Sequence, residues 1–473
     1  MSIRKSLAWS FSQQFAQFGL MFIGSIVIAR LLTPAEIGIF SLAMAASFFV
    51  SALREFGIGT YLIREEKLDD DKIRTAFGMW LLVSWTLGAA LLFSRHWIAD
   101  FYAEPGLADV IILTSVSFFV TPFGQPANAL LMREMRFDIL HHISLVCGVV
   151  GLATNITLAW LGYSYMALAW GLALGTVLRS ILLISVRPRH ITMLPSVRHW
   201  RAVMRFGGFM TLASILNTTN SEGLKFAMGA ILTPSAVALF EKAVQMPTLA
   251  RQAIFAPLGS VLTPAYAKAV RAGEDITGPY LKVIRYSTVL LWPAFLTLAL
   301  LAQSVIVALF GENWRVAGVI LPYLLASQAV ALIVFPANQA LIAHGKVKHI
   351  VSATAAVTSV SLASAILAMH VSLELFAQSR IPVAIVNVLI FGWCVRAVAG
   401  IGPRAVAKCL FKPALISVLG SAPAIGYRLT TIHDASLIHL IIIAMASVLC
   451  WFIAILLLKH EIMHEIKNVV SRF

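Results

Sequence analysis

A histidine-glutamate-histidine run near the end of the chain is the part of this sequence most like an enzyme motif. His460, Glu461 and His464 have the H-E-x-x-H spacing, in which two imidazoles one helical turn apart bind zinc and the glutamate acts as a general base. The run follows directly on a long apolar stretch, and no third ligand is evident after it. We therefore interpret it as a solvated helix end and predict no metal site.

Other enzyme signatures are absent from the sequence. The sequence contains no Walker-type phosphate loop and no nucleophilic G-x-S-x-G motif. Its four cysteines lie in or beside apolar stretches without paired spacing, which is typical of small core residues. They are Cys147, Cys394, Cys409 and Cys450. We expect a protein that is not an enzyme and that needs no cofactor.

Polar side chains inside the apolar stretches are better candidates for function, because each is costly in lipid unless it faces other helices or water. Near the N-terminus, Gln13, Gln14 and Gln17 fall on one face of a helix. Such a face either makes hydrogen bonds between helices or lines a cavity. We favour the cavity, because the internal repeat described below places polar residues at the equivalent positions of the second half.

A second polar stretch contains Asn217, Glu222 and Lys225. Glu222 and Lys225 are three residues apart and can form an ion pair on one helical face. The pair either neutralises itself, or a substrate or coupling cation competes for one partner. With Arg54 and Arg251, basic side chains outnumber unpaired acids in the apolar stretches. An anionic ligand such as a phosphate is therefore expected.

The elements that position these side chains are membrane-spanning helices. Of the 473 residues, 59% are hydrophobic and only 12% are charged, whereas soluble proteins have about 25% charged residues. A helix crosses a bilayer with about 20 apolar residues, and the sequence contains about fourteen such continuous runs. The predicted spans are residues 7–29, 37–58, 75–93, 107–131, 139–161, 164–186, 206–230, 236–262, 284–308, 318–342, 350–370, 378–400, 411–428 and 436–458.

The net charge of +15 is explained by membrane topology rather than by nucleic acid binding. Most lysines and arginines fall at the two termini and in alternate loops, including the basic segment 187–205. This positive-inside distribution predicts that both termini are cytoplasmic and that basic loops touch anionic lipid headgroups. Arg179, inside the sixth span, is expected to extend to the cytoplasmic surface.

Two matches at nearly the same offset indicate an internal duplication. Leu-Thr-Pro at 32–34 recurs at 232–234, and Pro-Ala-Asn at 126–128 recurs at 336–338. Because six spans separate equivalent positions, the halves are parallel repeats around a central cavity, an arrangement typical of alternating-access transporters. We predict an N-terminal six-helix lobe (1–190), a basic cytoplasmic linker (191–205), a C-terminal six-helix lobe (206–402), and two additional helices with a cytoplasmic tail (403–473).

Three short segments resemble a known family. The run ARLLTP at 29–34 with Gly38 and Phe40, LMREMRF at 131–137 and LFGENW at 309–314 are similar to segments of the Wzx-type polysaccharide flippases. These belong to the multidrug/oligosaccharidyl-lipid/polysaccharide exporter superfamily. The likeness covers residues 1 to about 400. It differs at Leu224, where the family often carries an acid.

The resemblance implies two six-helix lobes around a hydrated, cationic cavity that receives a sugar-pyrophosphate head while the polyprenyl tail stays in lipid. Arg30 matches the family motif and has an expected gating or structural role, whereas Glu222 is the acid nearest to the expected coupling position. The expected substrate-binding residues are Gln13, Gln14, Gln17, Arg54, Asn217, Lys225 and Arg251.

The expected function is a transporter of the bacterial inner membrane. It flips undecaprenyl-pyrophosphate-linked oligosaccharide repeat units from the cytoplasmic to the periplasmic leaflet, for exopolysaccharide, capsule or O-antigen biosynthesis. A lipid II flippase or a cation-coupled multidrug exporter of the same superfamily is the alternative. A membrane glycan polymerase or acyltransferase is disfavoured, because the outer loops are short. Membrane lipids, a polysaccharide polymerase and export proteins are further expected partners, and nucleic acid is not.

Overall fold

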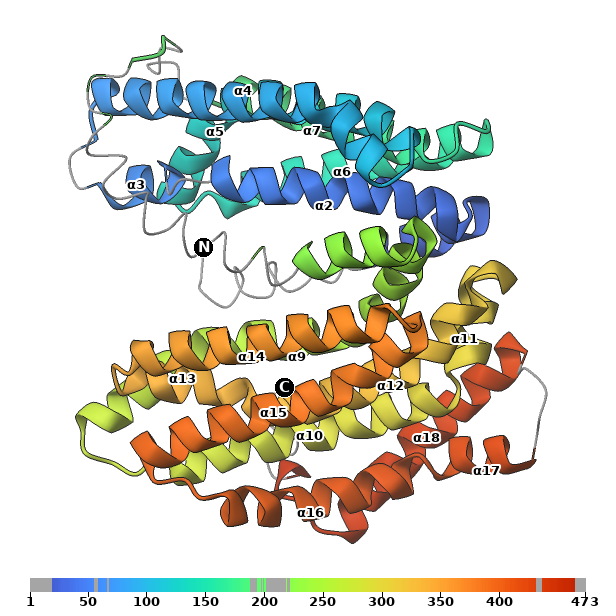
Figure 1. The fold of residues 1–473 in the computed structure, drawn as a ribbon. Coiled ribbons are helices and arrows are strands. Elements are labelled where there is room, and N and C mark those ends of the chain that lie inside the picture. Colours follow the sequence, from blue (N-terminus) through green and yellow to red (C-terminus); the bar gives the residue numbers. More distant parts are fainter. Residues whose placement is uncertain are drawn as a thin grey trace. The chain divides into compact units, whose positions relative to one another are not determined.

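The computed structural model describes residues 19–54, 58–65, 68–187, 194–196, 198, 200, 218, 222–430 and 436–463. Within these residues every regular element is a helix, as Figure 1 shows, so the predicted all-α membrane architecture is confirmed. The elements are α2 (Pro34–Arg54), α3 (Ile58–Arg64), α4 (Asp70–Phe101), α5 (Gly106–Arg133), α6 (Phe137–Trp160), α7 (Met166–Ser185), α9 (Pro234–Arg271), α10 (Thr277–Leu300), α11 (Ala302–Phe310), η1 (Glu312–Trp314), α12 (Arg315–Ala331), η2 (Leu332–Val334), α13 (Phe335–Ala343), α14 (Val347–Met369), α15 (Leu373–Ala399), α16 (Pro403–Gly420), α17 (Ala422–Thr430) and α18 (Leu437–Leu457).

Most predicted spans coincide with these helices. In the described part of the chain, ten helices are long and apolar enough to cross a bilayer, and α16 with α17 adds an eleventh that is bent by 48°. A shorter apolar helix, Gly19–Leu31, covers the end of the first predicted span. The start of that span, and most of the predicted span 206–230, lie outside the described residues. At 38 residues, α9 is about 57 Å long and exceeds the thickness of a bilayer.

Short polar residues cap the starts of two long helices, and a glycine ends one of them. Asp69 caps α4 by accepting the backbone N–H of Lys72 at 2.8 Å. Ser372 caps α15 in the same way, accepting the N–H of Leu375 at 3.0 Å. These bonds satisfy N–H groups that have no partner within the helix. At the other end of α15, Gly400 adopts the left-handed conformation (φ 71°) that terminates many helices.

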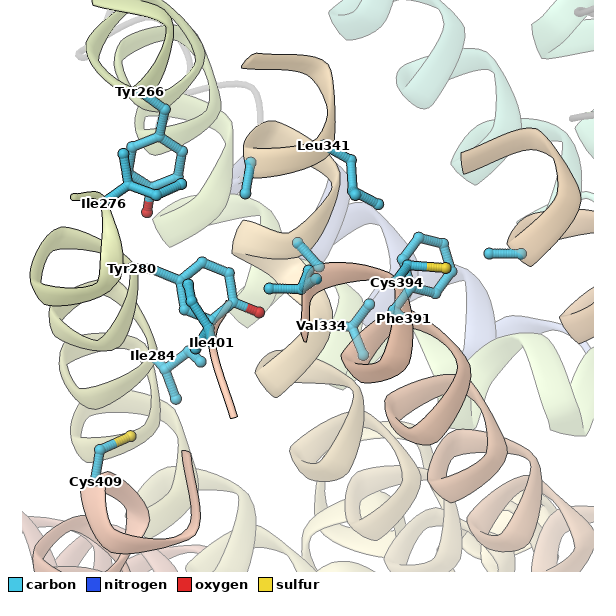
Figure 2. Packing of buried hydrophobic residues seen from close by; sticks show 14 residues of the cluster. Tyr266, Ile276, Tyr280, Ile284, Val334, Leu341, Phe391, Cys394, Ile401 and Cys409 are labelled. Atoms are coloured by element: carbon cyan, nitrogen blue, oxygen red, sulfur yellow. The ribbon is translucent and has the colours of Figure 1, made fainter. Parts of the chain in front are cut away.

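The described chain divides into two compact units, residues 1–238 and 239–473. In the first unit, Leu42 of α2, Leu91 of α4 and Phe118 of α5 belong to one buried cluster. Figure 2 shows a buried cluster of the second unit, where Tyr280 of α10 and Phe391 of α15 pack beside α13 and α16. The six-helix lobes expected from the repeat remain a proposal, because this division reflects compactness rather than duplication.

One interhelical contact recurs in the two units. In the first unit, the indole N–H of Trp85 on α4 donates to the carbonyl oxygen of Phe119 on α5 at 3.1 Å. In the second, the indole of Trp292 on α10 donates to the carbonyl oxygen of Ala329 on α12 at 2.9 Å. The tryptophan helices occupy the third position of each predicted half, and the acceptor helices the fourth. The offsets of 207 and 210 residues are close to those of the sequence repeat.

Candidate functional site

The Leu-Thr-Pro segment ends the first apolar helix and starts α2. The backbone N–H of Thr33 donates to Glu36 Oε2 at 2.7 Å, and the N–H of Glu36 donates to Thr33 Oγ1 at 3.4 Å. This reciprocal arrangement is a capping box, with Pro34 as the first helical residue. The hydroxyl of Ser164 donates to the other oxygen of Glu36. Arg30 lies immediately before this junction with its side chain exposed.

The second Leu-Thr-Pro segment begins α9 in a similar way. Thr233 Oγ1 accepts the N–H of Ala236 at 3.2 Å, but the position equivalent to Glu36 is Ala236 itself, so the cap is one-sided. The starts of α2 and α9 meet inside the first unit, because a Cβ atom added at Gly38 would lie 2.0 Å from the carbonyl oxygen of Pro234. Glycine at position 38 therefore permits direct backbone contact between the two repeated junctions.

Glu222 and Lys225 form an ion pair in the helical segment 222–231. Lys225 Nζ lies 2.9 Å from Glu222 Oε2, and the two side chains are only 19% and 13% exposed, respectively. The following residue, Phe226, packs edge-to-face on Phe49 of α2, with ring centroids 6.3 Å apart. The segment that carries the pair thus packs against α2, and both side chains of the pair are largely buried, so the loss of one partner leaves a costly unpaired charge.

Arg54 lies at a polar pocket of the first unit. The cavity has a volume of about 190 Å³ and lies between α2, α3, α4 and α5. Its lining residues are Arg54, Gly59, Thr60, Ile63, Trp80, Ser84, Thr121, Gln125, Asn128 and Met132. The Arg54 guanidinium lies 5.1 Å from the centre of the Phe118 ring, a cation–π distance. The hydroxyl of Ser84 is buried and has no hydrogen-bond partner among the described residues.

A second arginine orients one wall of this pocket. Arg179 of α7 donates to Ser144 Oγ of α6 at 2.8 Å and, at 3.4 Å, to Asn128 Oδ1 of α5. Arg179 is half-buried and uses its guanidinium inside the unit, and its extension to the cytoplasmic surface stays a prediction. Asn128 belongs to the repeated Pro-Ala-Asn segment, which places one element of the duplication at the pocket.

Of the remaining predicted site residues, one lies in the second unit and the others lie outside the described residues. Arg251 lies in the middle of α9, in the second unit, and its side chain is exposed. Gln13, Gln14, Gln17 and Asn217 lie outside the described residues. The role of each of these residues in substrate binding therefore stays a prediction.

A buried lysine and a half-buried arginine of the second unit were not among the sequence candidates. Lys242 of α9 is 8% exposed, with Nζ 4.7 Å from the centre of the Phe310 ring and 5.1 Å from that of Trp314. Arg380 of α15 donates to Ser361 Oγ of α14 at 2.9 Å. The segment LFGENW supplies both aromatic partners of Lys242, but only the fold shows that they face a lysine some 70 residues earlier in the chain.

The histidine run is not the solvated helix end that the sequence suggested. His460 is 2% exposed, and burial, followed by the neighbouring positive charge of Arg285, lowers its pKa. Glu461 is exposed and forms an ion pair with Arg285 of α10. His464 lies outside the described residues, and the described part of the chain holds no group of three side chains able to bind a metal.

Comparison with known proteins gives a consistent result. Residues 27–318 match the model of a family described as polysaccharide biosynthesis protein. An uncharacterized membrane protein in the cps region of Klebsiella pneumoniae is 24% identical over 73% of this chain and 72% of its own length. The lipopolysaccharide biosynthesis protein WzxC of Escherichia coli is 22% identical over 65% of this chain and 63% of its own length.

A solved structure extends the likeness to nearly the whole chain. The lipid II flippase MurJ, in an inward closed conformation, aligns with 96% of this chain and 99% of its own, with a TM-score of 0.79. The sequence identity is 14%, so this match concerns the fold. The match therefore extends well beyond residue 318, where the match to the family model ends.

Proposed function

Because the chain belongs to the polysaccharide biosynthesis protein family, we propose that it is a flippase that carries a lipid-linked oligosaccharide across the bacterial inner membrane. The proposed substrate is an undecaprenyl-pyrophosphate-linked repeat unit, moved from the cytoplasmic to the periplasmic leaflet. The proposed pathway is exopolysaccharide, capsule or O-antigen biosynthesis. The names of the two relatives, one from a cps region and one from lipopolysaccharide biosynthesis, support this assignment.

The observation that carries the proposal is the polar pocket around Arg54 within an otherwise apolar bundle. An arginine, several hydroxyls and two amides converge there, and Trp80 contributes an aromatic wall. Hydroxyls and amides match the hydrogen-bonding groups of a sugar, and a guanidinium matches a phosphate or a carboxylate. A cavity of about 190 Å³ suits one such group rather than a whole repeat unit. We therefore assign it a part of the transported headgroup.

Alternating access is the proposed mechanism. The two repeated Leu-Thr-Pro junctions and the repeated tryptophan contact support parallel repeats, in which a substrate site opens to each side of the membrane in turn. Gln13, Gln14, Gln17, Asn217, Lys225 and Arg251 are proposed to contact the substrate along this path. Glu222 either couples transport to a cation or only neutralises Lys225, and Arg30 has a proposed gating or structural role.

Flipping of lipid II is the second candidate, and the fold match to MurJ favours it. Both substrates have a polyprenyl-pyrophosphate anchor, so basic side chains near the pyrophosphate suit either one. Transport of the two lipids by purified protein in vesicles distinguishes the candidates. We expect the oligosaccharide-linked lipid to be translocated and lipid II to compete poorly.

The Arg54 assignment is tested in the same vesicle assay, or by complementation of a strain that lacks its own polysaccharide flippase. Arg54→Ala should lower the transport rate about ten- to a hundredfold, because one charge-assisted contact is worth about 1.5 to 3 kcal/mol. Arg54→Glu should be worse and Arg54→Lys milder. Arg404→Ala, at an exposed arginine of α16, is the control. Normal transport by Arg54→Glu at equal protein level would remove the pocket from the transport path.

Membrane orientation is part of the proposal, with both termini in the cytoplasm. Reporter fusions after residues 195 and 473 should both give a cytoplasmic signal. A periplasmic signal at either position would contradict the parallel arrangement of the halves.

A further inference from the structure

A second cavity lies between the ends of three helices of the second unit, and most of its lining residues come after residue 318, where the match to the family model ends. It has a volume of about 490 Å³ and is bounded by the first half of α10, the first half of α16 and the turn that follows α18. Its lining includes Lys408, Phe411 and Lys412 of α16, and Lys459, His460 and Glu461 after α18. Neither the sequence candidates nor the proposed transport path includes this pocket.

Basic side chains dominate the charge around this pocket. Arg285, Lys408, Lys412 and Lys459 oppose one carboxylate, Glu461, which is ion-paired with Arg285. The three lysines are exposed, so they reach the mouth of the cavity, and Lys408 and Lys412 lie one turn apart on the same side of α16. With Glu461 and Arg285 paired, the three lysines remain as an excess of positive charge.

The turn after α18 brings the histidine into the wall of the pocket. The N–H of His460 donates to the carbonyl oxygen of Ile455 at 3.1 Å, and the N–H of Lys459 donates to that of Leu456 at 3.2 Å. These two bonds form a Schellman motif, in which Lys459 occupies the left-handed position (φ 45°) that glycine usually takes. The reversal turns His460 inward and leaves Lys459 exposed beside it.

His460 supplies a hydrogen-bond donor that has no acceptor. Its Nδ1 accepts the backbone N–H of Ile462 at 3.2 Å, so the neutral ring carries its proton on Nε2. That Nε2 group is buried and has no partner among the described residues. A buried donor without an acceptor is unfavourable, and an anionic oxygen is the acceptor that the surrounding lysines also favour.

The outer boundary of the pocket is apolar. Phe411 lines the pocket and is 72% exposed, and Leu457, two residues before the lining residue Lys459, is 74% exposed, as expected for side chains that face lipid. The basic residues therefore lie where an apolar helix surface ends, which is the place where a membrane helix meets the phospholipid headgroups. A soluble anion needs only the basic side chains, whereas a lipid contacts both the basic side chains and the apolar wall of such a site.

We propose that this pocket binds the phosphate headgroup of an anionic membrane phospholipid. Lys408, Lys412 and Lys459 contact the phosphate, His460 Nε2 donates to one of its oxygens, and Phe411 packs against the glycerol and the start of an acyl chain. Basic pockets between helix ends recognise lipid headgroups by this combination of charge and apolar surface. The proposal concerns a resident lipid of the bilayer and does not depend on which substrate is transported.

The test measures lipid binding to the purified full-length protein in detergent, by native mass spectrometry and by thermal unfolding. The probes are phosphatidylglycerol, phosphatidylcholine with the same acyl chains, and inorganic phosphate. Phosphatidylglycerol should bind at least about tenfold more tightly than phosphatidylcholine, and it should raise the unfolding midpoint. Millimolar inorganic phosphate should give neither effect. Equal stabilisation by free phosphate and phosphatidylglycerol would identify an anion site without lipid specificity and overturn the proposal.

Two double variants test the location. Lys408→Ala with Lys412→Ala should weaken phosphatidylglycerol binding about tenfold or more, while the unfolding midpoint without lipid stays unchanged, because both side chains are exposed. Lys346→Ala with Lys348→Ala removes the same charge from exposed lysines beside the start of α14, outside the pocket, and should change binding less than twofold. An equal loss in both variants would show non-specific attraction and overturn the site. His460→Phe removes the donor and should weaken binding further when combined with the first pair.

Discussion

Gly38 and Pro234 are in direct backbone contact: a Cβ atom added at Gly38 would lie 2.0 Å from the carbonyl oxygen of Pro234. These residues belong to the two copies of one sequence pattern, since Gly38 follows the first Leu-Thr-Pro segment and Pro234 is part of the second. The start of α2 therefore has no room for a side chain at this position. The contact gives a physical reason for glycine at position 38, whereas the equivalent position of the second copy is Ala238.

Gly38→Ala should therefore destabilise the protein. The added methyl group overlaps backbone rather than a flexible side chain, so the helices must move apart, at a cost of about 1 to 3 kcal/mol. A lower thermal unfolding midpoint in detergent would show this effect. Gly392→Ala in α15 is the matched control, because a Cβ atom there meets nothing within 4 Å. Equal midpoints for the two variants would contradict the close contact.

The Glu222–Lys225 pair should show strong energetic coupling. Replacing Lys225 by Ala leaves a mostly buried carboxylate without its partner, which should cost about 1 to 3 kcal/mol, less than for a fully buried pair. Replacing both residues by Gln and Met should restore most of the stability, because no unpaired charge remains. Thermal unfolding of the single and double variants completes the cycle. Additive losses would mean that the two charges act independently.

Transport by the same variants distinguishes a structural pair from a coupling site. If the two charges only neutralise one another, the stable double variant should still transport. If the substrate competes for Lys225 or a cation competes for Glu222, the double variant should be stable but inactive. Abundance in the membrane has to be measured beside transport, so that a folding defect is not mistaken for a loss of coupling.

Charge reversal at Lys225 and Arg251 tests the cationic path. Arg251→Glu should reduce transport at least tenfold at unchanged abundance, because its exposed side chain leaves the packing of α9 intact. Arg251→Lys should have a mild effect. Lys225→Glu should also reduce transport, but it places two carboxylates one turn apart and needs a stability control. Full transport by both charge-reversal variants would refute a substrate path lined by basic side chains.

The buried His460 should make stability depend on pH. Its pKa lies below the ordinary value of 6.5, mainly because burial disfavours the charged ring. Below pH 6.5 the unfolded chain therefore binds a proton that the folded chain does not, so the free energy of unfolding falls as the pH decreases. The unfolding midpoint of the native protein should drop between pH 7 and pH 5, and His460→Gln should show a smaller drop. The same drop in both would assign it to other groups.

The sequence alone determined that this chain is a membrane protein and approximately where its helices lie. Continuous apolar runs such as 139–161 and 436–458 are long and apolar enough to lie in the lipid bilayer. In lipid the backbone N–H and C=O groups must bond to one another, and a helix makes these bonds within a single segment. The repeated Leu-Thr-Pro and Pro-Ala-Asn segments predicted a duplication, and the three family segments predicted the function. These signals are local, so they could be identified without knowing which helices touch.

The tertiary structure decided which polar side chains share a site. Arg54 and Asn128 line one pocket although 74 residues separate them, and Lys242 meets the ring of Phe310, which is 68 residues later. The sequence gives no distance between such residues, because apolar spans of similar composition can pack in many orders. His460 illustrates the same limit, since a motif that reads as a solvated helix end is buried by the turn at Lys459. Burial and partner choice depend on packing between helices, which is a property of the folded chain and not of any one segment.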